Sequence, residues 1–85
     1  MKKVDQKYKY YLVDMGPLII EMALEIKENY IRKKKGSPEY EFDAGQLMAY
    51  NAIIAFMQSQ AEAFDIDLKE IGLDDIDPLK ELIFP

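Results

Sequence analysis

The sequence predicts an all-α protein in which an antiparallel helical hairpin is followed by a short helical tail. Two long segments place apolar residues three and four positions apart, which is the spacing of one face of a helix. Gly36 and the pair Ser37 and Pro38 lie between them, in a linker short enough to fold the second segment back along the first. With 85 residues, the chain is expected to form a single domain over residues 1–85.

The first helix is expected over about residues 4–35, ending before Gly36, because glycine commonly follows a helix end. Pro17 interrupts this segment, since proline removes a backbone hydrogen bond and crowds the preceding turn. The apolar spacing keeps its phase across Pro17, so we expect a helix kinked there, or broken into two nearly collinear helices with Asp14 or Gly16 as the cap. The main apolar face is Val4, Tyr8, Tyr11, Met15, Leu18, Met22 and Ile26, flanked by Leu12, Ile19, Ala23 and Tyr30.

A second apolar strip lies on the opposite side of this helix. A single exposed leucine would carry no meaning, because folded surfaces contain much apolar area. Four apolar residues in register on a back face instead predict a second contact surface. This strip is Val13, Ile20, Leu24 and Ile31.

The second helix is expected over about residues 43–64. Asp43 as the cap and Gln46 three residues later form a capping box, while Phe42 packs on Leu47 as a hydrophobic staple. The apolar residues that follow alternate three and four apart, which predicts a core face turned toward the first helix. This face consists of Leu47, Tyr50, Ile54, Met57, Ala61 and Phe64, widened by Ile53 and Phe56.

Residues 44–61 contain no charged side chain. A surface helix carries charge on its solvent side, whereas an uncharged helix is buried on most sides. One short chain cannot surround it, so we expect two copies to associate into a four-helix-bundle-like homodimer. Small side chains on the reverse face either allow close approach of another helix or simply favour helix formation. The predicted interface is Met48, Ala52, Ala55 and Ser59, together with the strip on the first helix.

Residues 65–85 form an acidic tail. Asp67–Ile71 is expected to make one helical turn ended by Gly72. Asp77 and Pro78 are typical of a cap and a first-turn proline, and predict a short helix to about Ile83. The apolar residues of the tail are numerous enough to dock it on the two helices. They are Leu73, Ile76, Leu79, Leu82 and Ile83.

Charge is divided between the two halves of the chain. Residues 1–36 carry a net charge of +4 and residues 37–85 a net charge of −9, which total −5. The cations Arg32 and Lys33–Lys35 complement the dipole at the end of the first helix. The division also favours antiparallel packing of unlike ends, within one chain or across a dimer.

No metal, cofactor or catalytic site is predicted. The chain has no cysteine and no histidine, which removes thiolate and imidazole ligands. The tail aspartates do not fit a calcium-binding loop, because a loop beginning at Asp65 has Glu70, and one beginning at Asp75 has Lys80, where the pattern requires glycine. Neither serine has an obvious base beside it, so we expect the protein not to be an enzyme.

Lysines interleave with tyrosines near the N-terminus, a pattern typical of surfaces that stack bases and contact phosphates. Against this interpretation, Tyr8 and Tyr11 belong to the predicted core face, and the net charge is negative where nucleic-acid binders are usually basic. We therefore expect no nucleic-acid partner and keep this interpretation third. The residues concerned are Lys2, Lys3, Lys7, Lys9, Tyr8, Tyr10 and Tyr11.

The leading interpretation is a homodimeric protein–protein interaction module, a scaffold or adaptor, with no small-molecule ligand indicated. The alternative is a neutralising partner, such as an antitoxin, immunity protein or chaperone, whose acidic half binds a basic protein. Glu21 and Glu25 interrupt the most apolar part of the first segment, and residues 44–61 are too polar to cross a membrane. No membrane span is therefore expected. The opening residues lack the apolar run of a signal peptide, which favours a cytoplasmic location.

Overall fold

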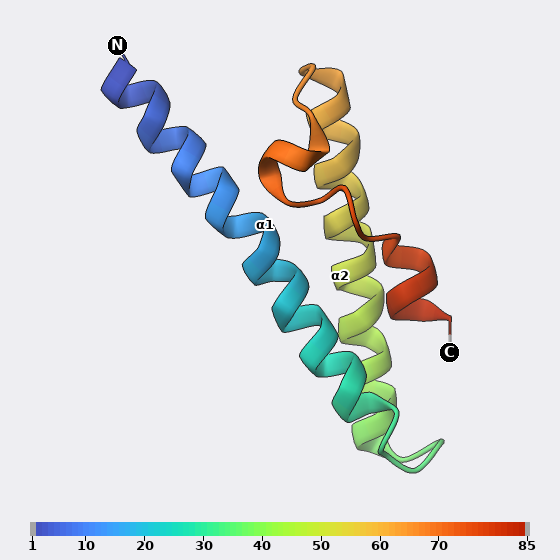
Figure 1. The fold of residues 1–85 in the computed structure, drawn as a ribbon. Helices are drawn as coiled ribbons and strands as arrows, with labels where there is room; N and C mark the ends of the chain where they lie inside the picture. The colour runs from blue at the N-terminus through green and yellow to red at the C-terminus, as the bar shows by residue number, and fades with distance from the viewer. Residues whose placement is uncertain (1, 85) are drawn as a thin grey trace.

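The computed structural model describes residues 2–84, with side chains from residue 6 onward, and it is helical with no strand in that range. Helix α1 (Lys2–Tyr30) and helix α2 (Pro38–Ala63) form an antiparallel hairpin. Two short helices follow: η1 (Leu68–Ile71), of 3-10 type, and η2 (Leu79–Ile83), of π type. The predicted all-α hairpin with a helical tail is confirmed, and Figure 1 shows the tail running back along α2 toward the loop that joins the helices.

Helix α1 is one element of 29 residues that passes through Pro17, so the predicted alternative of two separate helices is wrong. It ends at Tyr30 instead of near Lys35. Beyond Tyr30 the backbone N–H groups of Arg32 and Lys33 donate to carbonyls three residues back, at 3.2 and 3.1 Å, which tightens the chain out of the α-helix. Gly36 then turns the linker with a left-handed φ of 83°.

Helix α2 begins at Pro38, before the predicted start at Asp43. The Oγ atom of Ser37 accepts a hydrogen bond from the backbone N–H of Tyr40 at 3.2 Å, so Ser37 is the cap and Pro38 occupies the first turn, where its missing N–H costs little. The predicted pairing of Asp43 with Gln46 is present, but inside the helix: the Nε2 atom of Gln46 donates to Asp43 at 3.1 Å. Ser37 and Asp43 both have the local sequence of a helix cap, and the helix begins at the earlier of the two.

The tail begins its two short helices as predicted. The Asp67 side chain accepts from the backbone N–H of Lys69 at 3.0 Å, and Gly72 ends η1 in the left-handed conformation. Asp77 accepts from the backbone N–H of Lys80 at 3.2 Å, while Glu81 accepts from the backbone N–H of Asp77 at 2.9 Å. These two bonds hold the chain at the start of η2, whose cap residue is Pro78.

The tail supplies part of the core, which consists of two clusters of buried side chains. Because each cluster joins residues of α2 to residues of the tail, the hairpin does not enclose its apolar residues without residues 71–82. The first cluster is Ala23, Leu47, Ile54, Ile76 and Leu82. The second cluster is Ala61, Ile71 and Leu73.

Contacts at Gly16 and Gln58 are among those that fasten the tail to the helices. A Cβ atom on Gly16 would lie 2.0 Å from the carbonyl oxygen of Ile71, so the end of η1 approaches α1 at a point that only glycine leaves open. The Nε2 atom of Gln58 donates to the carbonyl oxygens of Leu73 and Ile76 at 3.0 and 2.9 Å. Gly16 is therefore a packing position and not the helix cap that the sequence allowed.

The core face of α1 is narrower than predicted. Ala23 is fully buried, and Ile19, Ile20, Ile26 and Tyr30 pack against the clusters. Most of the rest of the predicted face is exposed in the single chain, while Met15 is half-buried and the side chain of Val4 lies outside the described residues. This part of the prediction therefore does not describe the core. The exposed members are Tyr8, Tyr11, Leu18 and Met22.

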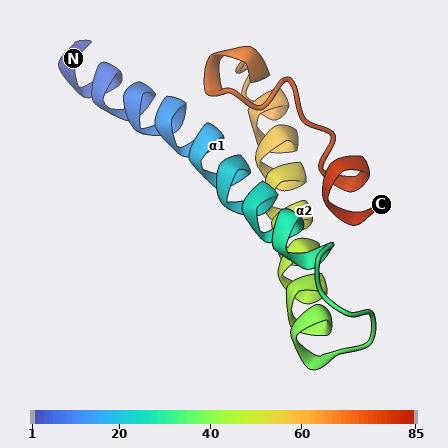
Figure 2. The ribbon, with the colours of Figure 1, turned by 60° about the horizontal axis from the view of Figure 1, so that its bottom comes forward.

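The chain is elongated, measuring 52 × 20 × 16 Å. Its radius of gyration is 15.0 Å, whereas a compact chain of this length has about 12 Å. Figures 1 and 2 show the reason: the helices lie together near the connecting loop and diverge toward the start of α1 and the end of α2. We call these two regions the closed end and the open end. Within the described residues, no helix has the length and apolar character of a membrane span.

Candidate interaction surface

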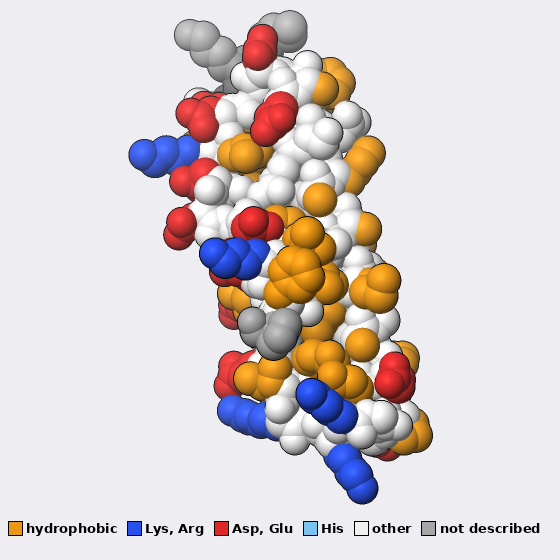
Figure 3. Space-filling view, turned by 90° about the vertical axis from the view of Figure 1, so that its right-hand side faces the viewer, with side chains coloured by type: hydrophobic (Ala, Val, Ile, Leu, Met, Phe, Trp, Pro, Cys, Tyr) orange, Lys and Arg blue, Asp and Glu red, His pale blue; other side chains and the backbone are white. Residues whose placement is uncertain are grey.

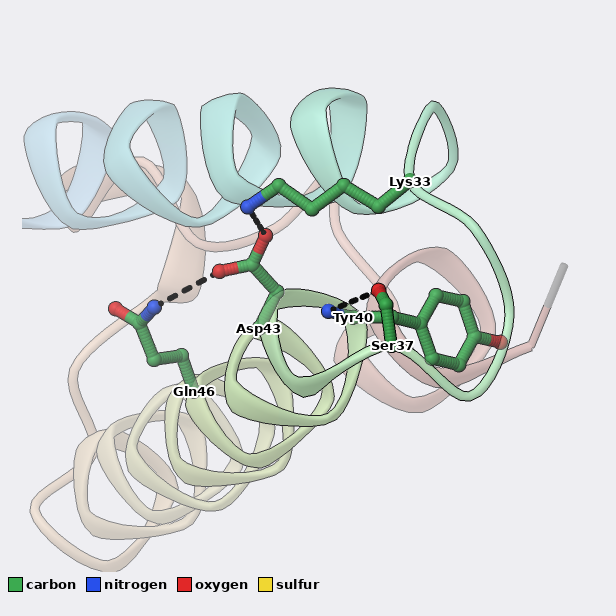
Figure 4. Close-up of polar contacts among 5 residues, drawn as sticks. All are labelled: Lys33, Ser37, Tyr40, Asp43 and Gln46. Atoms are coloured by element: carbon green, nitrogen blue, oxygen red, sulfur yellow. Dashed lines mark hydrogen bonds and ion pairs between the residues drawn. The ribbon is translucent and has the colours of Figure 1, made fainter.

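At the closed end, polar and aromatic side chains pair with one another within the chain. Lys33 forms an ion pair with the buried carboxylate of Asp43, which also accepts from Gln46 (Figure 4). The rings of Tyr30 and Tyr40 stack with centroids 4.4 Å apart, and the hydroxyl of Tyr30 donates to that of Tyr40 at 2.7 Å. This hydrogen bond raises the pKa of Tyr30 above its ordinary value of 10.0. These contacts join the two helices at the closed end.

The outer side of α2 is exposed and uncharged. Met48 is 64 % exposed, and Ala52, Ala55 and Ser59 are also exposed, so all four predicted interface residues of this helix lie on the surface of the single chain. In Figure 3 the charged side chains gather mainly on the tail and near the two ends, while hydrophobic side chains follow α2 for most of its length. A partner helix would meet small side chains and one methionine there.

The predicted strip on α1 is not one uniform surface. Ile20 packs against both core clusters, and Val13 is half-buried beside η1. Leu24 and Ile31 are exposed. The tail therefore covers one part of this strip and leaves the other part open, and its role as an interface stays a prediction.

The open end contains exposed aromatic residues that the sequence analysis assigned to the core. Phe64 is 73 % exposed and Phe56 is 64 % exposed. They line a hollow of about 180 Å³ together with Leu12 of α1 and Ile66 and Ile71 of the tail. The spacing of α2 correctly placed these aromatics on the α1 side, but it carried no information on where the two helices diverge.

The exposed N-terminal tyrosines remove one argument against nucleic-acid binding, because Tyr8 and Tyr11 do not lie in the core. Lys7, Lys9 and Tyr10 are exposed as well. The side chains of Lys2 and Lys3 lie outside the described part of the chain. The negative net charge of −5 still opposes binding to a polyanion.

The exposed area exceeds what a compact monomer of this size presents. A 9.9 kDa folded monomer exposes about 5,200 Å² by the usual scaling of area with mass, whereas this chain exposes 6539 Å². The excess is about 1,300 Å² per chain, and a standard protein–protein interface buries about 800 Å² on each partner. The excess of total exposed area accompanies the elongated shape of the chain.

The described side chains hold no group of three or more acidic residues close enough together to bind a metal ion. The chain matches no protein-family model, no curated protein and no solved structure.

Proposed function

We propose that the protein is a homodimeric interaction module, a scaffold or adaptor, in which two copies meet on the outer side of α2. The observation that carries this proposal is the uncharged, exposed face of α2 at Met48, Ala52, Ala55 and Ser59. Exposed apolar patches are typical of protein–protein contacts.

The side chains of this face suit a helix–helix contact. Alanine and serine let two helices approach to the near end of the usual separation of about 8–10 Å. The absence of charge removes the cost of desolvating ionised groups. Two copies of α2 packed antiparallel would place identical patches against each other, as the twofold symmetry of most homodimers requires.

The experiment is the measurement of molar mass by light scattering and sedimentation. We expect a dimer of the 9.9 kDa chain at ~100 µM, and dissociation in Ala55→Glu, because two buried carboxylates would face each other. Lys34→Glu, in the exposed linker, is the control that should keep the dimer. A folded wild-type chain that stays monomeric at this concentration would refute the proposed dimer.

A neutralising role remains the second candidate, favoured by the exposed carboxylates of the tail. Among the described side chains, the ion pairs join Arg32 to Glu28 and Lys33 to Asp43, so none of these involves an acidic residue of the tail. Binding of a basic protein through these carboxylates would weaken steeply with salt, whereas association through the outer side of α2 would not. Salt dependence therefore separates the two candidates.

A further inference from the structure

A cavity of about 330 Å³ lies at the closed end, where both helices, their linker and η2 meet. Its lining combines lysines, tyrosines and isoleucines, and it contains no carboxylate among the described side chains. We call this site the closed-end cavity. It is lined mainly by Lys27 of α1, Ile31, Lys33 and Lys35 of the linker, Tyr40 of α2 and Ile83 of η2.

Two of the three lysines bring a positive charge that nothing in the lining balances. Lys33 forms the ion pair with Asp43, so its charge is compensated. Lys27 instead donates to two neutral backbone carbonyls of the tail, at 3.2 and 3.0 Å. Lys35 belongs to no ion pair among the described side chains, and the first-turn carboxylates of α2 lie outside the lining. The closed-end cavity is therefore positive, although the chain as a whole is negative.

Hydrogen-bond donors also remain available in the lining. The ammonium group of Lys27 has three N–H groups, and the two tail carbonyls use two of them. The hydroxyl of Tyr40 accepts from that of Tyr30 at 2.7 Å, while its own proton has no acceptor among the described residues. The ammonium group of Lys35 adds further donors. An anion accepts hydrogen bonds from all of these groups at once, and such charge-assisted bonds are the strong ones.

The rest of the lining is apolar and sets the size of the ligand. Ile31 and Ile83 line the closed-end cavity together with the rings of Tyr30 and Tyr40. A water molecule occupies about 30 Å³, so the volume suits a ligand of about ten non-hydrogen atoms. A bare inorganic ion would leave these apolar side chains uncovered, whereas a nucleotide is too large.

We propose that the closed-end cavity binds a small phosphate monoester whose phosphate is attached to a compact apolar body. A phosphate monoester carries about −1.5 to −2 charges at pH 7, which balances two lysines, whereas a carboxylate balances one. The phosphate accepts from Lys27, Lys35 and Tyr40, and the apolar body packs on Ile31 and Ile83. The site is formed within a single chain, so this inference goes beyond the proposed homodimer and does not depend on it.

The first test compares three probes by isothermal titration calorimetry with the full-length chain at low salt. Phenyl phosphate, which has the proposed size and charge, should bind with a Kd of about 1 mM or below. Inorganic phosphate lacks the apolar body and phenol lacks the charge, so each should bind at least about tenfold more weakly. Absence of phenyl phosphate binding up to about 10 mM would overturn the proposal. Equal binding of phenyl phosphate and inorganic phosphate would do the same, because it would indicate an adventitious ion only.

Two neighbouring lysines provide a matched pair of variants that locates the phosphate. Lys35→Met should weaken the binding of phenyl phosphate by about tenfold, as expected for the loss of a charged hydrogen bond. Lys34→Met removes the same charge from the same linker but lies outside the lining, so it should change the affinity by less than about twofold. Both side chains are exposed, so circular dichroism should show both variants folded. Equal loss in the two variants would indicate diffuse attraction to the basic linker and would contradict the assignment.

A matched pair of isoleucine variants locates the apolar body. Ile31→Ala should weaken the binding of phenyl phosphate by about threefold or more and leave that of inorganic phosphate unchanged, because only the ring contacts this side chain. Ile53→Ala, at an exposed position of α2 outside the lining, should affect neither probe. If Ile31→Ala binds phenyl phosphate as tightly as the wild type does, the body lies elsewhere and the proposal is wrong.

Molar mass measured on the same samples keeps this inference separate from the proposed dimer. A wild-type monomer that binds phenyl phosphate with these variant effects would refute the dimer and support the site. A wild-type dimer that binds no phenyl phosphate would keep the dimer and overturn the site.

Discussion

The closed and open ends of the hairpin contain similar side chains in opposite situations. At the closed end, Tyr30 stacks on Tyr40 and η2 covers the adjacent part of α2. At the open end, Phe56 and Phe64 belong to the same apolar side of α2 but face a gap. Whether an aromatic side chain is covered therefore depends here on the distance between the two helices. Residue type and spacing do not set that distance.

The two ends also differ in their charges. The buried carboxylate of Asp43 is held by Lys33 and Gln46, so the closed end has no unsatisfied buried side chain among the described residues. At the open end the carboxylates of Glu62 and Glu70 remain in solvent. The closed end therefore contains an internal ion pair, whereas these two carboxylates of the open end have none among the described side chains.

The largest expected contrast is between Leu82→Ala and Phe64→Ala. Leu82 is fully buried against α2, so its truncation should lower the free energy of unfolding by about 3 kcal/mol. Phe64 is exposed, and its truncation should change stability by no more than about 0.5 kcal/mol. Urea denaturation followed by circular dichroism measures both. A similar loss in the two variants would mean that the open end is as well packed as the closed end.

A pair of glycine variants comes next. Gly16→Ala places a methyl group against the carbonyl of Ile71 and should cost about 2 kcal/mol, because the end of η1 must move away from α1. Gly45→Ala meets open space within α2 and should stabilise by about 0.5–1 kcal/mol. Thermal unfolding of both variants checks the signs. A stabilising Gly16→Ala would contradict the close approach of the tail.

Loss of the ion pair at the closed end should lower the free energy of unfolding by a smaller amount. Asp43→Ala leaves Lys33 and Gln46 without their acceptor and should cost about 1–2 kcal/mol. Glu28→Ala breaks only the exposed pair with Arg32 and should cost no more than about 0.5 kcal/mol. Chemical denaturation at low and high salt distinguishes them. Equal losses in the free energy of unfolding would show that the burial of Asp43 adds nothing to its ion pair with Lys33.

The smallest expected effect is a change in how the free energy of unfolding falls as the pH becomes alkaline. The hydrogen bond to Tyr40 raises the pKa of Tyr30, so the folded chain resists ionising this hydroxyl. Its contribution is fully present below pH of about 10, the unfolded value, and is lost as the pH rises through the raised folded pKa. Tyr30→Phe should therefore lose stability less steeply than the wild type in that range. Identical slopes for Tyr30→Phe and the wild type would contradict this linkage.

The sequence by itself determined the secondary structure and the caps of the tail. Apolar spacing placed two long helices, Asp67 with Gly72 bounded η1, and Asp77 with Pro78 began η2, because these signals act between residues a few positions apart. The same reasoning applied to Ser37 and Pro38 would have found the true start of α2, but the capping box at Asp43 was locally just as valid. The absence of charge between Ala44 and Ala61 predicts a partner for α2, and that partner stays a proposal.

Only the tertiary structure decided which side of α1 is buried and where the hairpin opens. Gly16 and Ala23 set that face, since their small size lets the tail and α2 approach the backbone, and apolar spacing does not rank small residues above large ones. Asp43 became buried because Lys33 reaches it from the linker, ten residues away in sequence. The hollow lined by Phe56 and Phe64 arises where the two helices diverge, a long-range property that no local pattern encodes.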